Sequence, residues 1–121
     1  MPETYESLVR ALKALTRGEA PDTETLPMAE NGWNTRPDTV SYGIVNLDFE
    51  TTPLYGDNVK QDTAHEGSLD LYSRKKDGDG WIPMLEETLT EHCEGCWSLN
   101  FHTHETESNL FHWEWVFEVE G

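Results

Sequence analysis

The segment 97–120 alternates between large apolar and polar side chains, which is the pattern of strands with one buried face. The apolar set consists of Trp97, Leu99, Phe101, Phe111, Trp113, Trp115, Phe117 and Val119. The polar set consists of Ser98, Asn100, His102, His104, His112, Glu114, Glu118 and Glu120. The run 105–109 between the two halves has the composition of a turn. The segment is therefore predicted to form an aromatic β-hairpin with one apolar side and one solvent-facing side.

Two segments, 2–17 and 81–92, repeat their apolar residues at the spacing of an α-helix. The stripe of the first consists of Tyr5, Leu8, Ala11, Leu12 and Leu15, and that of the second consists of Met84, Leu85, Thr88 and Leu89. Gly18 favours a left-handed end to the first helix. Asp79 is a candidate cap for the second helix, and Pro83 suits its first turn.

The remaining segments predict two further strands and one long connection. Residues 40–73 are expected to form two strands, 40–50 and 68–73, joined by an extended polar loop. Residues 19–39 have no regular period and form the connection, in which Trp33 must pack either on its own domain or on a neighbour. The order helix-strand-strand-helix-strand-strand predicts a single α+β domain over 1–121, with a mainly antiparallel sheet and helices packed on one face.

Composition limits the classes of function. Hydrophobic residues make up 36% of the chain, below the roughly 45–50% of typical globular domains, so we expect neighbouring chains to complete the burial. The formal net charge of −16 disfavours the wrapping of nucleic acid and binding to an anionic membrane. It suits a surface past which DNA slides. Glu3 and Glu6 stand where a signal peptide carries positive charges, and two cysteines give no disulfide framework, so a reducing compartment is expected.

A cluster of histidines and cysteines is the candidate for metal chemistry. Zinc is the metal that such ligands favour, and the candidate ligands are His92, Cys93, Cys96, His102, His104 and His112. One Cys-x-x-Cys pair is half of a zinc ribbon, so ordinary polar surface is the alternative interpretation. The turn 77–80 lacks the further acidic ligands of a calcium loop. No phosphate loop or nucleophile motif is present, so the expectation is a non-enzymatic protein without catalytic residues or cofactor.

Three parts of the chain follow one another in a characteristic order: Gly56-Asp57-Asn58, the segment 65–77 that reads HEGSLDLYSRKKD, and the helix at 81–91 followed by the aromatic hairpin. In this order they resemble the tail terminator (tail completion, or head–tail joining) proteins of long-tailed bacteriophages. The first helix matches in position, whereas the Cys93–Cys96 segment departs from the family pattern. Candidate subunit or partner contacts are Trp33, Tyr55, Asp57, Asn58, His65, Arg74, Lys75 and Lys76.

The resemblance implies a structural virion protein of the tail and neck, made in the host bacterial cytoplasm. Such a protein forms a homo-oligomeric ring, usually a hexamer, that caps the tail tube. Its partners are then the tail tube protein and the head-side connector or stopper, while genome DNA passes through the lumen without specific binding. The alternatives are another phage neck or tail-tube subunit, a small zinc-stabilised acidic binding module, and an acidic regulator that mimics DNA.

Overall fold

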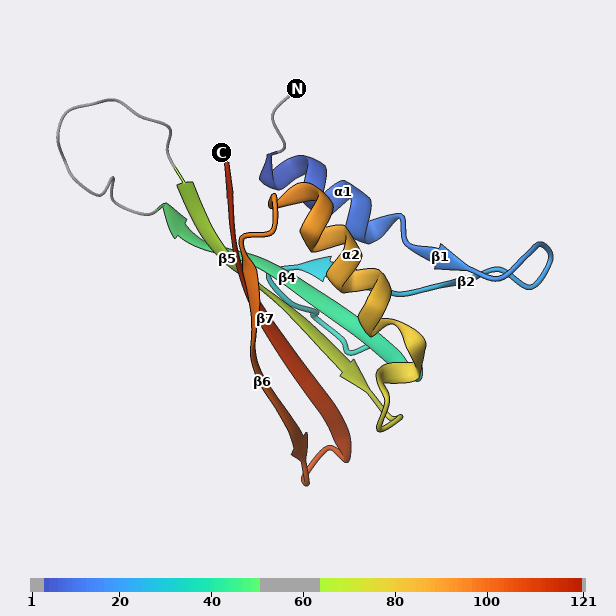
Figure 1. Ribbon diagram of the computed structural model, residues 1–121. Helices are drawn as coiled ribbons and strands as arrows, with labels where there is room; N and C mark the ends of the chain where they lie inside the picture. The colour runs from blue at the N-terminus through green and yellow to red at the C-terminus, as the bar shows by residue number, and fades with distance from the viewer. Residues whose placement is uncertain (1–3, 51–63, 121) are drawn as a thin grey trace, which may run out of the picture.

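The computed structural model describes residues 4–50 and 64–120, and its main element is a five-stranded sheet. The sheet contains β3 (Met28–Glu30), β4 (Ser41–Glu50), β5 (Ala64–Ser73), β6 (Trp97–Glu105) and β7 (Leu110–Glu120). The spatial order is β3-β4-β5-β7-β6, and only the pairing of β3 with β4 is parallel. Helices α1 (Tyr5–Lys13) and α2 (Ile82–His92) lie beside each other over this sheet (Figure 1). The predicted α+β class with a mainly antiparallel sheet is confirmed.

Both helices pack on the same face of the sheet, and the core lies between these two layers. Leu69 of β5 faces Trp115 of β7 in the strand register, and both side chains are fully buried. The indole Nε1–H of Trp115 donates to Glu86 of α2 over 2.9 Å, which satisfies the one polar group of that ring. Around this pair the same core contains Leu8, Leu12, Leu71, Leu85, Leu89, Trp113, Phe117 and Val119. We call this face of the sheet the helix face, and the opposite one the open face.

Helix α1 is shorter than the pattern predicts. Thr4 and Ser7 cap its first turn reciprocally, because each side chain bonds the backbone N–H of the other residue. The helix ends at Lys13, and Thr16–Arg17 then form β1, which pairs with β2 (Glu24–Thr25). The prediction of helix over 2–17 is therefore wrong at its end. The apolar period continues to Leu15, but the chain leaves the helix to pair with a partner that the period does not reveal.

Helix α2 occupies Ile82–His92, as expected for 81–92, but its start differs from the prediction. Trp81 is the residue before the first turn and makes no capping bond through its side chain. Asp79 instead belongs to a short 3₁₀ turn, η1 (Gly78–Gly80), in which Asp77 accepts the N–H of Asp79 at 2.9 Å. The turn η1 and the helix α2 follow each other directly. The capping carboxylate is that of Asp77 and it caps η1, so the prediction that Asp79 caps α2 is wrong.

The predicted connection 19–39 contains the strands β2 and β3, and the second predicted strand begins at Ala64 instead of Ser68. The predicted order of elements consequently lacks three short strands. Strands of two or three residues are too short for an apolar alternation to develop, so the sequence pattern does not reveal their pairing. Trp33 packs on its own domain, since its Nε1–H donates to the carbonyl of Gly43 over 3.1 Å.

The hairpin occupies the expected segment, but a register shift between Leu99 and Phe101 changes the alternation of β6. After this bulge, His102 pairs with Trp113 and His104 pairs with Phe111 on the helix face. Phe101 crosses to the open face, where it meets His112. The prediction that His102, His104 and His112 share one polar face is therefore wrong, because one extra residue in a strand inverts every side chain that follows.

Leu85 offers a test of the core between α2 and the sheet. We expect Leu85→Ala to lower the free energy of unfolding by about 2–5 kcal/mol, because a fully buried leucine leaves a cavity. Val40→Ala is the control, since Val40 is exposed and its truncation is expected to change stability by less than about 0.5 kcal/mol. Urea denaturation followed by tryptophan fluorescence measures both variants. Equal effects of the two substitutions would contradict the two-layer packing.

Candidate interaction surfaces

Five ring side chains form a continuous row across the open face of the sheet. Trp33 meets Tyr42 edge-on at 6.3 Å, and Tyr42 stacks on Tyr72 with centroids 5.0 Å apart. Tyr72 stacks on His112 at 4.1 Å, and Phe101 closes the row edge-on to His112 at 4.9 Å. The register explains the row, because Tyr42, Tyr72 and His112 are direct partners on β4, β5 and β7. This aromatic row buries polar strand residues on a face that the two helices do not cover.

His112 is held between two carboxylates at the end of the aromatic row. Its Nε2 lies 2.6 Å from Asp70 Oδ2, and its Nδ1 lies 3.0 Å from Glu105 Oε2. Burial opposes the charge on the imidazole, but the hydrogen bonds and charges of Asp70 and Glu105 outweigh it and raise the pKa of His112. Burial beside the same carboxylates raises the pKa of Tyr72. Both ring nitrogens of His112 are thus engaged, so the group serves to join β5, β6 and β7.

Strand β6 is the edge of the sheet and presents large apolar side chains to solvent. Leu99 is 48% exposed and Phe101 is 38% exposed, while Val116 on the neighbouring strand is 37% exposed. Residues 97–104 contain no Asp, Glu, Lys or Arg. Charged residues are the usual means by which a protein blocks pairing at an exposed sheet edge. Within the described chain, β6 is therefore the strand best suited to contact another protein.

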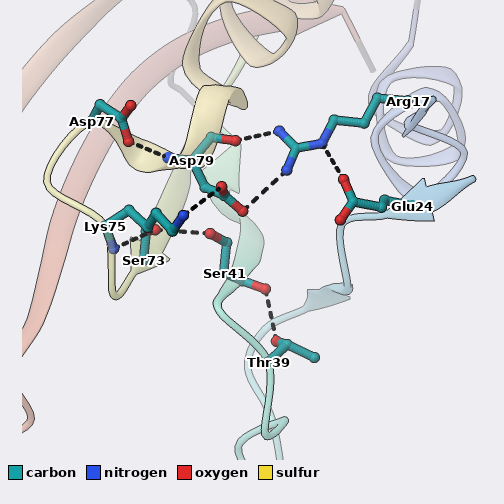
Figure 2. Close-up of polar contacts among 8 residues, drawn as sticks. All are labelled: Arg17, Glu24, Thr39, Ser41, Ser73, Lys75, Asp77 and Asp79. Atoms are coloured by element: carbon teal, nitrogen blue, oxygen red, sulfur yellow. Dashed lines mark hydrogen bonds and ion pairs between the residues drawn. The ribbon is translucent and has the colours of Figure 1, made fainter. Parts of the chain in front are cut away.

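Arg17 is the centre of a second polar cluster, with Glu24 and Asp79 (Figure 2). Its guanidinium donates to Glu24 over 2.8 Å, to the Asp79 carboxylate over 3.1 Å and to the Asp79 carbonyl. The same group lies 4.2 Å from the ring centroid of Trp81, in a cation–π contact. Gly80 leaves room for it, since a Cβ there would lie 3.0 Å from Arg17 Nη1. Arg17 thus ties the hairpin β1–β2 to the turn before α2.

Hydrogen bonds fix the basic turn that follows β5. Ser41 Oγ donates to Ser73 Oγ over 2.8 Å, and Ser73 Oγ accepts the backbone N–H of Lys75 at 3.0 Å (Figure 2). The ammonium group of Lys75 lies 4.0 Å from Asp79, next to the Arg17 cluster. The turn is therefore held from both sides by side chains of the same domain.

The structure describes five of the eight residues predicted as partner contacts. Arg74, Lys75 and Lys76 are exposed, and Arg74 pairs with Asp38 over 3.2 Å. Trp33 and His65 are partly buried. Tyr55, Asp57 and Asn58 lie outside the described residues. The sequence did not indicate that Tyr42, Tyr72 and Asp70 belong to the aromatic row or to the bonds around His112, because both depend on strand register.

The candidate zinc ligands do not come together. His102 and His104 stack on Trp113 and Phe111, away from the face of His112. Cys93 is buried and Cys96 is exposed; burial, together with the Cys96 thiol, raises the pKa of Cys93 to about 12. In the segments 4–50 and 64–120, no group of three His, Cys, Asp or Glu side chains is arranged to hold a metal ion.

The surface of the described residues is hollowed at two places, among others. One of about 550 Å³ lies at the start of β6 beside Cys96, Trp97 and Glu118, and the other, of about 320 Å³, lies beside Arg17 and Trp81. Of the described side chains that line them, none forms a hydrogen-bonded pair of nucleophile and base. The sheet surfaces are therefore the stronger candidates for function.

Searches against protein-family models, curated proteins and solved structures find no match to this chain. Neither α1 nor α2, the two described helices, has the length and apolar character needed to cross a bilayer.

The His112 clamp predicts a pH dependence. Because the folded pKa of His112 lies above the ordinary value of 6.5, its stabilisation is complete below pH 6.5 and is lost as the pH rises through the folded pKa. NMR titration of the imidazole is expected to give a pKa above 6.5, and Glu105→Gln is expected to lower it. Glu107→Gln, at an exposed position two residues further on, is the control and leaves it unchanged. A His112 pKa below 6.5 in the native protein would contradict the clamp.

The Arg17 cluster predicts that lysine cannot replace this arginine. Arg17→Lys keeps the charge but loses the planar group that reaches Glu24, Asp79 and Trp81 together, so we expect a loss of about 1–2 kcal/mol of unfolding free energy. Arg10→Lys, at an exposed position on α1, is the matched control and is expected to be nearly neutral. Thermal and urea denaturation compare the two. The cluster has no structural role if both substitutions have the same effect.

Proposed function

We propose that this protein is a structural virion component of the tail terminator type. Six copies form a closed ring that caps the tail tube and joins it to the head-side connector, while genome DNA passes through the lumen. The observation that carries this proposal is the uncharged, apolar edge of β6, which lies on the outside of the sheet with Leu99 and Phe101 exposed. A long uncharged edge of this kind is a liability in a monomer and an advantage in an assembly.

The charge of the chain supports the passage of DNA through such a ring. A net charge of −16 leaves no excess of cations to neutralise phosphates, so the strong salt-dependent attraction of DNA-binding proteins is missing. A lumen built from these chains repels the phosphate backbone and lets the genome move. The resemblance of the segment 65–77, the helix at 81–91 and the hairpin 97–120 to tail terminators supports the same assignment.

Native mass spectrometry and negative-stain electron microscopy of the full chain test the proposal. We expect one closed ring of six copies at concentrations of up to about 1 mM. A protein that stays monomeric over this range would overturn the proposal. Open tubes in place of closed rings would point to a tail-tube subunit, since a subunit that stops a tube must itself stop polymerising.

A further inference from the structure

The charges of this protein are separated along the chain and across the sheet. Residues 77–120 contain eleven Asp and Glu and no Lys or Arg. Residues 4–47 and 64–76 contain seven Lys and Arg against eight Asp and Glu. The first group builds α2, β6 and β7, and the second builds α1 and the strands β1 to β5 (Figure 1). The part of the molecule built by α2, β6 and β7 is therefore strongly acidic. The part built by α1 and β1 to β5 is nearly neutral and contains every Lys and Arg of the described residues.

Four exposed cations lie on the segments just before β4 and just after β5, and these two strands pair at Ser41 and Ser73. We call this surface the basic corner, and it consists of Arg36, Arg74, Lys75 and Lys76. The ion pair between Arg74 and Asp38 and the bond from the Arg74 N–H to the carbonyl of Val40 hold the turn against the preceding loop. Since such exposed ion pairs are weak, Arg74 remains accessible to another carboxylate.

The strand β6, at one edge of the sheet, carries a surface with negative charges. We call it the acidic edge, and it consists of the strand β6 together with the exposed residues Glu94, Glu107 and Glu118. Glu94 precedes the strand and Glu107 follows it, while the backbone of Glu118 bonds Cys96 just before β6. The acidic edge thus combines apolar contact area in the middle with carboxylates around it, which is the usual anatomy of a protein interface.

We infer that the acidic edge of one copy docks on the basic corner of the next copy. A two-fold contact of β6 with β6 would bring two acidic edges together, and like charges across an interface cost affinity. A head-to-tail contact brings the carboxylates of one copy against the cations of the next. Such a contact generates a ring when the rotations that relate successive copies add up to a full turn. This inference rests on the proposed ring and names the surfaces that build it.

A charge-swap experiment on the full chain tests the head-to-tail contact. The first variant is Glu107→Lys with Glu118→Lys, and the second is Arg36→Glu with Lys76→Glu; all four positions are exposed. Each variant alone is expected to weaken assembly by at least about tenfold, because like charges then meet at every junction. An equal mixture of the two is expected to restore rings of alternating variants, in which half of the junctions are swapped and half are native. Native mass spectrometry distinguishes the mixed rings by mass.

The control for the net charge of the first variant is Glu19→Lys with Asp22→Lys, which makes the same change of charge as Glu107→Lys with Glu118→Lys, at exposed positions of the turn between β1 and β2. It is expected to assemble like the native protein, and circular dichroism confirms that every variant is folded. Rings that form in both interface variants as readily as in the native chain would overturn the head-to-tail contact and leave the proposed function standing. A native protein that never forms rings would overturn both, as would one that forms only two-fold dimers.

Discussion

The helices of this protein cover one face of its sheet, and the other face must bury its polar strand residues without a second layer from the described part of the chain. Burying a carboxylate such as Asp70 costs several kcal/mol unless a partner compensates it. His112 supplies that partner, and the stacked rings of Tyr42 and Tyr72 exclude water beside it. The open face is therefore stabilised by strand register, because a slip of one residue would remove the ring and the carboxylate from their partners together.

The same shortage of covering material explains the edge of the sheet. A chain with 36% hydrophobic residues fills the layer between helices and sheet, where Leu69 and Trp115 lie, and within residues 4–50 and 64–120 it places no further element over β6. Leu99 and Phe101 consequently stay exposed, although their size would favour burial. In the proposed ring, contact with another copy would remove this exposed surface from water, so folding and assembly would draw on the same limited set of apolar side chains.

The sequence predicts the parts of this fold that repeat a pattern over many residues. The alternation of β7 and the stripe of α2 are long enough to identify, and Arg74 to Lys76 are visible as an exposed basic run. The alternation of residues in β6 does not indicate the bulge, because Phe101 and His102 can each lie on either face of the sheet. Only the register with β7 determines which face each takes. The strands β1 to β3 were not predicted because two or three residues cannot show an alternation. The contact between Arg17 and Asp79 was not predicted because the two residues lie far apart in the chain.

A ring closes only when each subunit presents its two contact surfaces at a fixed angle, since a small error repeated around the ring produces an open spiral. The acidic edge is part of a continuous sheet and has little freedom. The basic corner lies on a turn, so its orientation depends on the bonds that hold the turn: Ser73 fixes the backbone of Lys75, and Arg17 holds Asp79 on the other side. In the proposed ring, residues that only stabilise the fold of one copy would thereby determine the geometry between copies. Loss of the Arg17 cluster would leave the charges of the basic corner in place and change the direction in which they point.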